Sequence, residues 1–247
     1  MKQRLDKLLL QRGLVPSRER AQALIIAGKV LVDEQKVEKP GASVESDSAI
    51  RLLGEDLRYV SRGGLKLEKA LEHWKIDVNG KTCVDVGAST GGFTDCLLQH
   101  GAARVIAIDT GRGQIDAKLR NDVRVKLLEQ TNARYLTREQ LDLNGRADLV
   151  AMDVAFISAT LVLPAVVAAA EPREIVVLVK PQFEVGRERV GSGGIVRDEA
   201  DQAAAVAKVR EAVGQLGGTK TDVIESPITG AEGNREFLLH AVFPAKS

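Results

Sequence analysis

The chain has 247 residues, 44% of them hydrophobic, and a formal net charge of +1 at pH 7. This length and composition fit one large or two smaller folded domains and exclude a chain that cannot form a core. The longest apolar runs, 161–170 and 175–179, are much shorter than the roughly 20 residues that a membrane-spanning helix needs. The N-terminus has no apolar signal core, so we expect a cytoplasmic protein without a membrane partner.

Cysteine content and charge distribution narrow the possible partners. The two cysteines, Cys83 and Cys96, fall inside predicted elements and favour core thiols over a disulfide framework or a metal cluster. Residues 1–30 hold seven Lys or Arg against two acids, whereas residues 31–60 hold four against seven. Such a basic segment suits the phosphates of a nucleic acid, with a solvated helix face as the alternative.

The first sixty residues indicate a small α+β domain. Apolar residues at helical spacing before Gly13 and before Gly28 predict two short helices. Two strands are predicted over 29–32 and 49–53. We place this domain at 1–60.

A linker and a longer second domain are predicted to follow. Residues 61–65 contain a glycine pair and are interpreted as a flexible linker, which places the second domain at 66–247. This domain opens with a helix whose apolar side chains are predicted to pack inward and to leave Lys66 on another face.

From residue 82 onward, short apolar runs alternate with helical patterns, which predicts an α/β domain with a parallel sheet covered on both faces. Its first five strands are predicted at 82–86, 105–109, 125–129, 149–153 and 175–179. Two more are predicted near 222–226 and at 236–243, and the last is interpreted as the antiparallel edge.

A glycine-rich stretch, Asp85-Val86-Gly87-Ala88-Ser89-Thr90-Gly91-Gly92-Phe93-Thr94, joins the first of these strands to a helix. Glycines let a backbone turn sharply and a helix start offers unpaired N–H groups, so the loop suits a polar ligand. A dinucleotide is disfavoured because Ser89 stands where a second glycine is needed, and a nucleoside triphosphate because no lysine follows Gly92. A nucleoside ligand without a pyrophosphate remains, with an ordinary strand-to-helix turn as the alternative.

Polar residues directly after the strands are further candidates, because ligands of open parallel sheets bind at the carboxyl ends of strands. Asp109 lies where an acid can accept hydrogen bonds from a ribose. Asp153 and Lys180 each follow an apolar strand and predict either a structural ion pair or an acid beside a working base. Asn132 is a candidate for contacting an adenine, and three nearby residues compete for that role, Gln130, Thr131 and Arg134.

Two motifs resemble known families. The pattern D-x-G-A-x-x-G-G-F resembles the S-adenosylmethionine (SAM) loop of FtsJ-like RNA 2′-O-methyltransferases. The run Arg4-Leu5-Asp6-Lys7-Leu8-Leu9, with Ser17-Arg18 and the pattern up to Val32, resembles the S4-type RNA-binding domain. These resemblances imply a Rossmann-like SAM-dependent methyltransferase fold with a mostly parallel seven-stranded sheet, preceded by a small α+β S4-type domain.

The resemblances also imply a ligand for each domain. SAM would be bound by Asp85, Gly87, Ala88, Ser89, Thr90, Gly91, Gly92, Phe93, Asp109, Asn132 and Asp153. RNA would be bound by Arg4, Lys7, Arg18, Arg20, Lys29 and Arg62.

Five blocks resemble the TlyA family of SAM-dependent ribosomal RNA cytidine 2′-O-methyltransferases, often labelled haemolysin A: 62–67, the glycine loop, 153–158, 179–184 and 226–236. The family's Lys-Asp-Lys-Glu tetrad falls on Lys66, Asp153, Lys180 and Glu236. The resemblance implies a one-step displacement without a metal, in which an RNA 2′-oxygen attacks the methyl carbon of SAM. Lys180 would take or steer the 2′-OH proton with help from Lys66, and the two acids would orient the lysines.

Other functions fit the sequence less well. Base methylation is disfavoured because 153–156 lacks the proline pair of exocyclic-amine enzymes and neither cysteine lies on a loop. A catalytically idle ribosome assembly factor would be expected to lose the tetrad or the glycine loop, and a membrane-active haemolysin would need an amphipathic or spanning segment. The expected partner is therefore ribosomal RNA or a ribosomal subunit, 23S before 16S, while the target nucleotide and the oligomeric state stay open.

Overall fold

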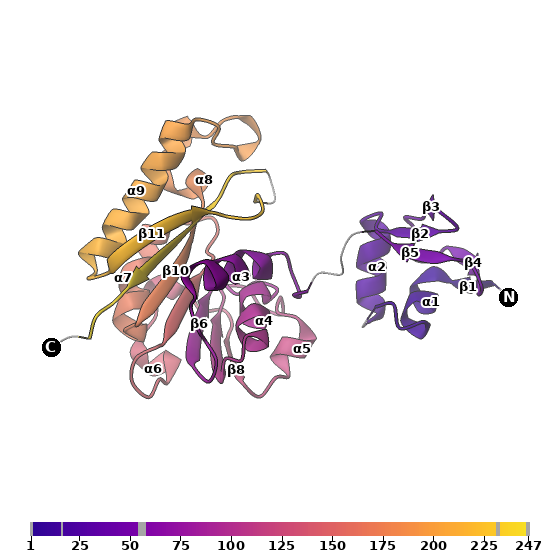
Figure 1. Cartoon of the computed structure of the whole chain (residues 1–247), viewed down its shortest axis with the longest axis horizontal. Helices are drawn as coiled ribbons and strands as arrows, with labels where there is room; N and C mark the ends of the chain where they lie inside the picture. Colours follow the sequence, from indigo (N-terminus) through magenta and orange to yellow (C-terminus); the bar gives the residue numbers. More distant parts are fainter. Residues whose placement is uncertain (1, 16, 54–57, 231–232, 246–247) are drawn as a thin grey trace. The chain divides into compact units, whose positions relative to one another are not determined.

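The computed structural model describes residues 2–15, 17–53, 58–230 and 233–245. The chain divides into two compact units, Met1–Arg58 and Tyr59–Ser247 (Figure 1). No helix among the described residues is both long enough and apolar enough to cross a membrane.

The first unit is an α+β domain with its own small core. Ser17 caps the second helix, its hydroxyl oxygen accepting a hydrogen bond from the N–H of Arg20. β2 pairs antiparallel with both β3 and β5, and β1 pairs with β4. The described elements are β1 (Lys2–Arg4), α1 (Leu5–Gln11), α2 (Arg18–Ile26), β2 (Val30–Val32), β3 (Gln35–Lys36), β4 (Ser43–Glu45) and β5 (Ile50–Leu52).

The second unit alternates strands and helices, as predicted. Up to the middle of the unit the elements are α3 (Gly63–Trp74), β6 (Thr82–Val86), α4 (Gly92–Gln99), β7 (Arg104–Ile108), α5 (Ala117–Arg120), β8 (Val125–Leu128), η1 (Ala133–Tyr135), α6 (Arg138–Leu141) and β9 (Leu149–Met152). They continue with α7 (Ala159–Ala170), β10 (Glu174–Val179), α8 (Pro181–Glu184), η2 (Arg187–Arg189), η3 (Ser192–Gly194), α9 (Glu199–Gln215), β11 (Thr219–Glu225) and β12 (Phe237–Val242).

The strands of the second unit form one sheet in the order β11-β12-β10-β9-β6-β7-β8, in which the five strands from β10 to β8 are parallel. Successive side chains of a strand point to opposite faces, so β6 places Cys83 in one core and Val84 and Val86 in the other. Helices α3 and α4 cover the first face, and α7 and α9 cover the second (Figure 1). The predicted α/β class with a mostly parallel seven-stranded sheet is confirmed.

The predicted flexible linker over 61–65 is wrong in its second half, because α3 already begins at Gly63. Gly64 is buried, and a side chain on it would overlap the ring of Tyr59. The glycine pair therefore permits close packing and does not supply flexibility. The same packing corrects the prediction for Lys66, which is 8% exposed and lies on a buried face of α3.

The last strand is antiparallel, as predicted, but it lies one place inside the sheet. β12 pairs with β10 on one side and β11 on the other, so β11 is the edge strand. The four central residues of β12 are buried, whereas polar residues occupy much of β11. A strand that is buried on both faces suits the interior of a sheet, and the more polar strand suits its edge.

Candidate active site

The glycine-rich loop between β6 and α4 is a tight turn held by the neighbouring strand. The N–H groups of Gly87 and Ala88 donate to the carbonyl of Ile108 on β7 over 2.9 and 3.0 Å. Gly87 has a φ of +88°, and a side chain on it would collide with the carbonyl oxygen of Asp153. Ser89 also has a left-handed φ, +49°, so the serine adopts the conformation that favours glycine. This explains how the loop forms without a second glycine at this position.

A close approach of two helix starts brings a lysine to this loop. Gly92 is the first residue of α4, and a side chain on it would overlap the hydroxyl of Ser61 and the backbone nitrogen of Gly64. Glycine at position 92 therefore lets the start of α3 pack against the start of α4. Lys66, one turn into α3, lines the cavity in front of the loop.

All four residues of the predicted tetrad line this cavity, which has a volume of about 290 Å³. Lys66 Nζ lies 2.5 Å from Glu236 Oε2, and Lys180 Nζ lies 2.5 Å from Asp153 Oδ1. Both lysine side chains are nearly buried, 10% and 13% exposed, so each cation is compensated by its own carboxylate. The first pair is a hydrogen-bonded ion pair, whereas the second is a close ion contact without hydrogen-bond angles.

The same cavity contains most of the predicted loop residues and one predicted RNA-binding residue. Arg62 is exposed and lies at its wall. The loop residues that line it are Gly87, Ala88, Ser89, Thr90, Gly92 and Phe93.

A second cavity of about 400 Å³ lies beside the first and shares Gly87, Ser89 and Asp153 with it. Its volume is within the range of small-molecule sites. Asp109 and Asn132, the predicted ribose and adenine contacts, both line it. The two cavities therefore meet at the end of β9, where Asp153 faces both.

Asp109 and Asn132 are already tied to the backbone around them. Asp109 accepts hydrogen bonds from the N–H groups of Ser89, 2.8 Å, and Gly111, 2.6 Å. Asn132 caps the short helix η1 by accepting from the N–H of Arg134 over 3.0 Å. A carboxylate has about four acceptor positions and an amide NH₂ has two donors, so both side chains keep hydrogen-bonding capacity for a ligand.

Two predicted cofactor contacts, Asp85 and Gly91, do not line either cavity. Asp85 is fully buried behind the loop, where Thr94 Oγ1 donates to its Oδ2 over 2.6 Å. Burial raises the pKa of its carboxyl to about 7. Gly91 has a φ of +99°, and a side chain on it would overlap Leu119. These residues shape the loop from behind, a role that the sequence pattern could not distinguish from contact.

Glu184 is a residue that the sequence reasoning missed. It is buried, its Oε1 accepts from the N–H of Ala159 over 2.6 Å, and its Oε2 accepts from Ser158 Oγ over 2.5 Å. Lys208 donates to its backbone carbonyl over 2.7 Å. Glu184 thus ties the turn after Lys180 to the start of α7, which follows the Asp153 loop. The available signal was its presence in the block 179–184.

Phe156 is also exceptional, because a large apolar side chain is 92% exposed and its backbone has a φ of +64°. It lines the second cavity, and its ring centroid lies 5.5 Å from that of Phe183 on α8. An aromatic residue held in a left-handed conformation at a cavity wall is typical of a functional position and not of a core.

The other predicted RNA-binding residues all lie in the first unit. Lys7 and Lys29 are exposed and make no ion pair with the residues that the structure describes, and Arg20 is partly exposed. Arg4 and Arg18 share one carboxylate, that of Asp6. The structure thus brings two of the predicted cations together around an acid that sequence reasoning did not single out.

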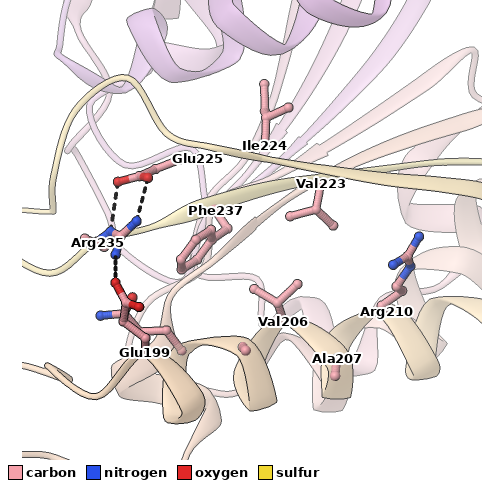
Figure 2. Close-up of a pocket in the computed structure, with 11 residues that line it drawn as sticks. Glu199, Val206, Ala207, Arg210, Val223, Ile224, Glu225, Arg235 and Phe237 are labelled. Atoms are coloured by element: carbon pink, nitrogen blue, oxygen red, sulfur yellow. Dashed lines mark hydrogen bonds and ion pairs between the residues drawn. The ribbon is translucent and has the colours of Figure 1, made fainter.

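A third cavity, of about 530 Å³, is a groove between α9 and the strands β11 and β12, away from the glycine loop (Figure 2). Its floor contains Val206 and Phe237, and the charges beside them compensate one another. Arg235 pairs with Glu225 over 2.8 Å and with Glu199 over 3.2 Å. None of the predicted site residues lines this groove, so its size alone does not make it the candidate site.

Comparison with known proteins assigns each unit to a family. Residues 59–243 match the model of the FtsJ-like methyltransferases, and residues 3–50 match that of the S4 domain. The chain is 48% identical over 238 residues to the 16S/23S rRNA (cytidine-2′-O)-methyltransferase TlyA of Mycobacterium tuberculosis, which covers 96% of this chain and 88% of the relative. A structure from Streptococcus thermophilus, provisionally named a hemolysin, has a TM-score of 0.76 at 41% identity and covers 99% of this chain and 90% of that one.

A more distant structure shares the fold alone. An S-adenosylmethionine-dependent methyltransferase from Mesorhizobium loti has a TM-score of 0.50 at 18% identity and covers 70% of this chain and 95% of that one. The Rossmann-like methyltransferase fold predicted for the second unit is thereby confirmed. The family model spans most of that unit and the S4 model most of the first, and the TlyA relative aligns with nearly the whole chain. This chain therefore belongs to the FtsJ-like methyltransferase family and carries an S4 domain at its N-terminus.

Proposed function

We propose that this protein transfers a methyl group from SAM to the 2′-oxygen of a cytidine ribose in ribosomal RNA. The single observation that carries the proposal is the junction of two cavities at Asp153, one lined by the ribose-binding candidate Asp109 and the other by two lysine–carboxylate pairs. A cofactor in one cavity and a nucleotide in the other would meet at that junction. The name of the M. tuberculosis relative supports the cytidine ribose of rRNA as the target.

The larger of these two cavities fits the nucleoside part of SAM. Asp109 has acceptor capacity for ribose hydroxyls, and the exposed amide of Asn132 can reach an adenine edge. Glycine at positions 87 and 92 lets the loop pack closely against the backbone of Asp153 and against the start of α3, which holds the loop at the junction. When bound, SAM supplies a methyl group on a sulfonium, which an oxygen nucleophile can attack.

The smaller cavity supplies the groups that act on the nucleotide. We assign proton removal or steering at the 2′-hydroxyl to Lys180, because it lies at a strand end beside Asp153 at the junction. Asp153 orients Lys180, and Glu236 orients Lys66 through a direct hydrogen bond. Where Lys180 takes the proton, it does so as the neutral amine and becomes a cation in that step. Lys66 and the newly protonated Lys180 then favour the negative charge that develops on the attacking oxygen.

The nucleotide would be bound by exposed aromatic and basic groups. Phe156 and Phe183 offer stacking surface for a base that has left its helix, which is how proteins commonly bind unpaired RNA bases. Arg62 lies at the wall of the smaller cavity, where it can contact a phosphate. The S4 domain supplies further basic residues for the surrounding RNA. Because ribosomal RNA is a cytoplasmic substrate in bacteria, we also infer a cytoplasmic location.

The test is methyl transfer itself. Purified protein should move the labelled methyl of SAM to protein-free 23S or 16S rRNA, and mapping of alkali-resistant linkages should place it on the ribose of a cytidine. Binding of rRNA without transfer would favour the idle assembly factor, and a label on a base would contradict the 2′-oxygen assignment.

A further inference from the structure

The first unit contains a carboxylate in an unusual position, Asp6 in the first turn of α1. Its side chain is 0% exposed, yet it is surrounded by cations that reach solvent. Arg4 donates to both of its oxygens, from Nε over 3.0 Å and from Nη2 over 2.9 Å. Arg18 on α2 donates from Nε over 2.9 Å, and Gln22 donates from its amide over 3.1 Å. We call Asp6, Arg4, Arg18 and Gln22 the Asp6 cluster.

The two arginines of the Asp6 cluster are held by Asp6 but keep N–H donors that do not bond to it. Their side chains are 48% and 43% exposed, so each guanidinium has one part on Asp6 and another part at the surface. A guanidinium has five N–H donors, of which Arg4 gives two and Arg18 gives one to Asp6. The cluster carries a net charge of +1 from two cations and one anion. What remains is a set of guanidinium donors not used by Asp6, on half-exposed side chains of β1 and α2 that share one anchor.

This arrangement reverses the usual effect of an acid near a nucleic acid. Counted as a charge, Asp6 lowers the positive potential that attracts phosphates. As an anchor, it removes the rotamer freedom of two long side chains before binding, which lowers the cost of ordering them on a partner. Arginine also matches phosphate geometry through paired N–H groups, an advantage that depends on the orientation of its fork.

We infer that Asp6 is a positioning residue that holds Arg4 and Arg18 as a pre-formed pair of phosphate ligands for the RNA backbone. The inference rests on the proposed function, since it takes RNA as the partner. It goes beyond that function by assigning affinity to an acidic residue that does not itself contact RNA. Arg4 is the last residue of β1 and Arg18 is the first residue of α2. Their shared bonds to Asp6 therefore also hold these two elements in place relative to each other.

The test compares two variants that remove one negative charge each from the full chain. Asp6→Asn loses the anchor, whereas Glu38→Gln removes an exposed acid whose side chain is 62% exposed and pairs with Lys36. Binding of a fluorescein-labelled stem–loop RNA is measured by anisotropy over a range of salt concentrations. Charge counting predicts tighter binding in both variants. The positioning role predicts that Asp6→Asn binds about tenfold more weakly, as for the loss of one charge-assisted contact, while Glu38→Gln does not weaken.

The salt dependence gives a second readout that loss of packing alone would not produce in a folded variant. Because each phosphate contact releases counterions, the slope of log K against log salt should become shallower in Asp6→Asn by about one contact. An unchanged or tighter affinity in folded Asp6→Asn would overturn the inference.

A further variant decides the matter if Asp6→Asn fails to fold. Arg18→Lys keeps the net charge and leaves Asp6 its Arg4 partner. A lysine has one ammonium nitrogen in place of the planar guanidinium, so it cannot bond to Asp6 as Arg18 Nε does and also present a fork of N–H groups to a phosphate. The inference predicts weaker RNA binding by Arg18→Lys, and equal affinity would overturn it. Lack of RNA binding by the unsubstituted chain would overturn the proposed function as well, whereas methyl transfer by that chain with unaltered binding in the variants would remove only the role of Asp6.

Discussion

Two aspartates without exposed side-chain surface, Asp6 in the first unit and Asp85 in the second, have opposite electrostatic states. Asp6 is held by arginines, and the hydrogen bonds from Arg4 in particular keep its pKa well below the usual range. Asp85 has the hydroxyl of Thr94 as its donor, and burial raises its pKa to about 7. The comparison teaches that hydrogen bonds from arginines can outweigh the effect of burial on a carboxyl, whereas a hydroxyl donor leaves burial as the larger effect.

The two units also differ in how exposed their paired cations are. In the first unit, a charged acid directs half-exposed cations toward solvent, where they can meet a diffusing polyanion. In the second unit, the cations are nearly buried and paired inside the cavity where we propose that the nucleotide binds. Cations of the first kind should set affinity and its salt dependence, and cations of the second kind should set the rate.

The largest effect is expected from removing a cation of the second kind. Lys180→Ala should lower single-turnover methyl transfer by about 10²–10⁴-fold, the usual contribution of a general base, with little change in SAM and RNA affinity. Lys66→Ala should be nearly as damaging. Single-turnover rates at saturating rRNA, with thermal melts of each variant, are the measurement.

Lys208→Ala is the matched control, because Lys208 pairs with buried Glu184 outside both cavities and should retain the rate. If Lys180 is only the structural partner of Asp153, its removal leaves a carboxylate unpaired and should cost roughly 3–5 kcal/mol of stability if the pair behaves as a buried one. A stable Lys180→Ala with a near-normal rate would remove Lys180 from the mechanism.

A smaller effect is expected from Asp85→Asn, and it should depend on pH. The folded-state pKa of Asp85, about 7, lies above the ordinary value of 3.8, so between about pH 4 and pH 7 the folded protein holds a proton that the unfolded chain releases. The contribution of Asp85 to stability therefore falls as pH rises through this window. The amide cannot titrate, so the variant should gain stability relative to the wild type from pH 5 to pH 8 by a few kcal/mol, at about 1.4 kcal/mol per pKa unit.

The measurement is denaturant unfolding followed by fluorescence of Trp74, the one tryptophan of the chain, which lies on α3 of the same unit. A stability difference between wild type and Asp85→Asn that is constant from pH 5 to pH 8 would contradict a proton on Asp85.

The contribution of Asp6 to stability should show the opposite pH dependence. Because the folded-state pKa of Asp6 is lowered, its stabilising contribution is present above the unfolded pKa and is lost as pH falls through that of the folded state.

Much of the fold and of the candidate site in the second unit could be predicted from the sequence, because both depend on local patterns. Apolar runs with a polar residue at their end located the strands and placed Asp109, Asp153 and Lys180 at one edge of the sheet. The glycine pattern located the loop. Strand ends of a parallel sheet converge whatever the details of packing, so these placements did not need a structure.

The rest depends on partners that are distant in sequence. Lys66 and Glu236 are 170 positions apart, and the burial of Lys66 follows from packing of α3 that the helical pattern does not specify. Asp85 looked like a ligand contact because the motif gives its position but not the direction of its side chain. The order of β11 and β12 had a readable signal, since the apolar β12 suits an interior place better than the polar β11.

The smallest expected effect concerns Asp109. This acid lines the larger of the two site cavities, whereas Asp85 lies behind the loop and lines neither. Asp109→Ala should weaken binding of S-adenosylhomocysteine by about tenfold in calorimetry, as for the loss of charge-assisted hydrogen bonds to a ribose. Asp109 also supports the loop through the N–H groups of Ser89 and Gly111, so weaker binding alone does not establish ribose contact. Glu129→Ala is the matched control, because Glu129 accepts from the N–H of Gly113 in the neighbouring turn and does not line the cavity.

A ligand variant separates direct contact from loop support. The 2′,3′-dideoxy analogue of S-adenosylhomocysteine lacks the ribose hydroxyls from which Asp109 is proposed to accept hydrogen bonds. The wild type should therefore bind the analogue more weakly than the parent compound, whereas Asp109→Ala should bind the two compounds about equally. The two losses should then be strongly non-additive, as for groups in direct contact. If Asp109→Ala weakens both ligands by the same factor, Asp109 acts through the loop alone. Its position would then resemble that of Asp85, an acid that shapes the site without contacting what binds there.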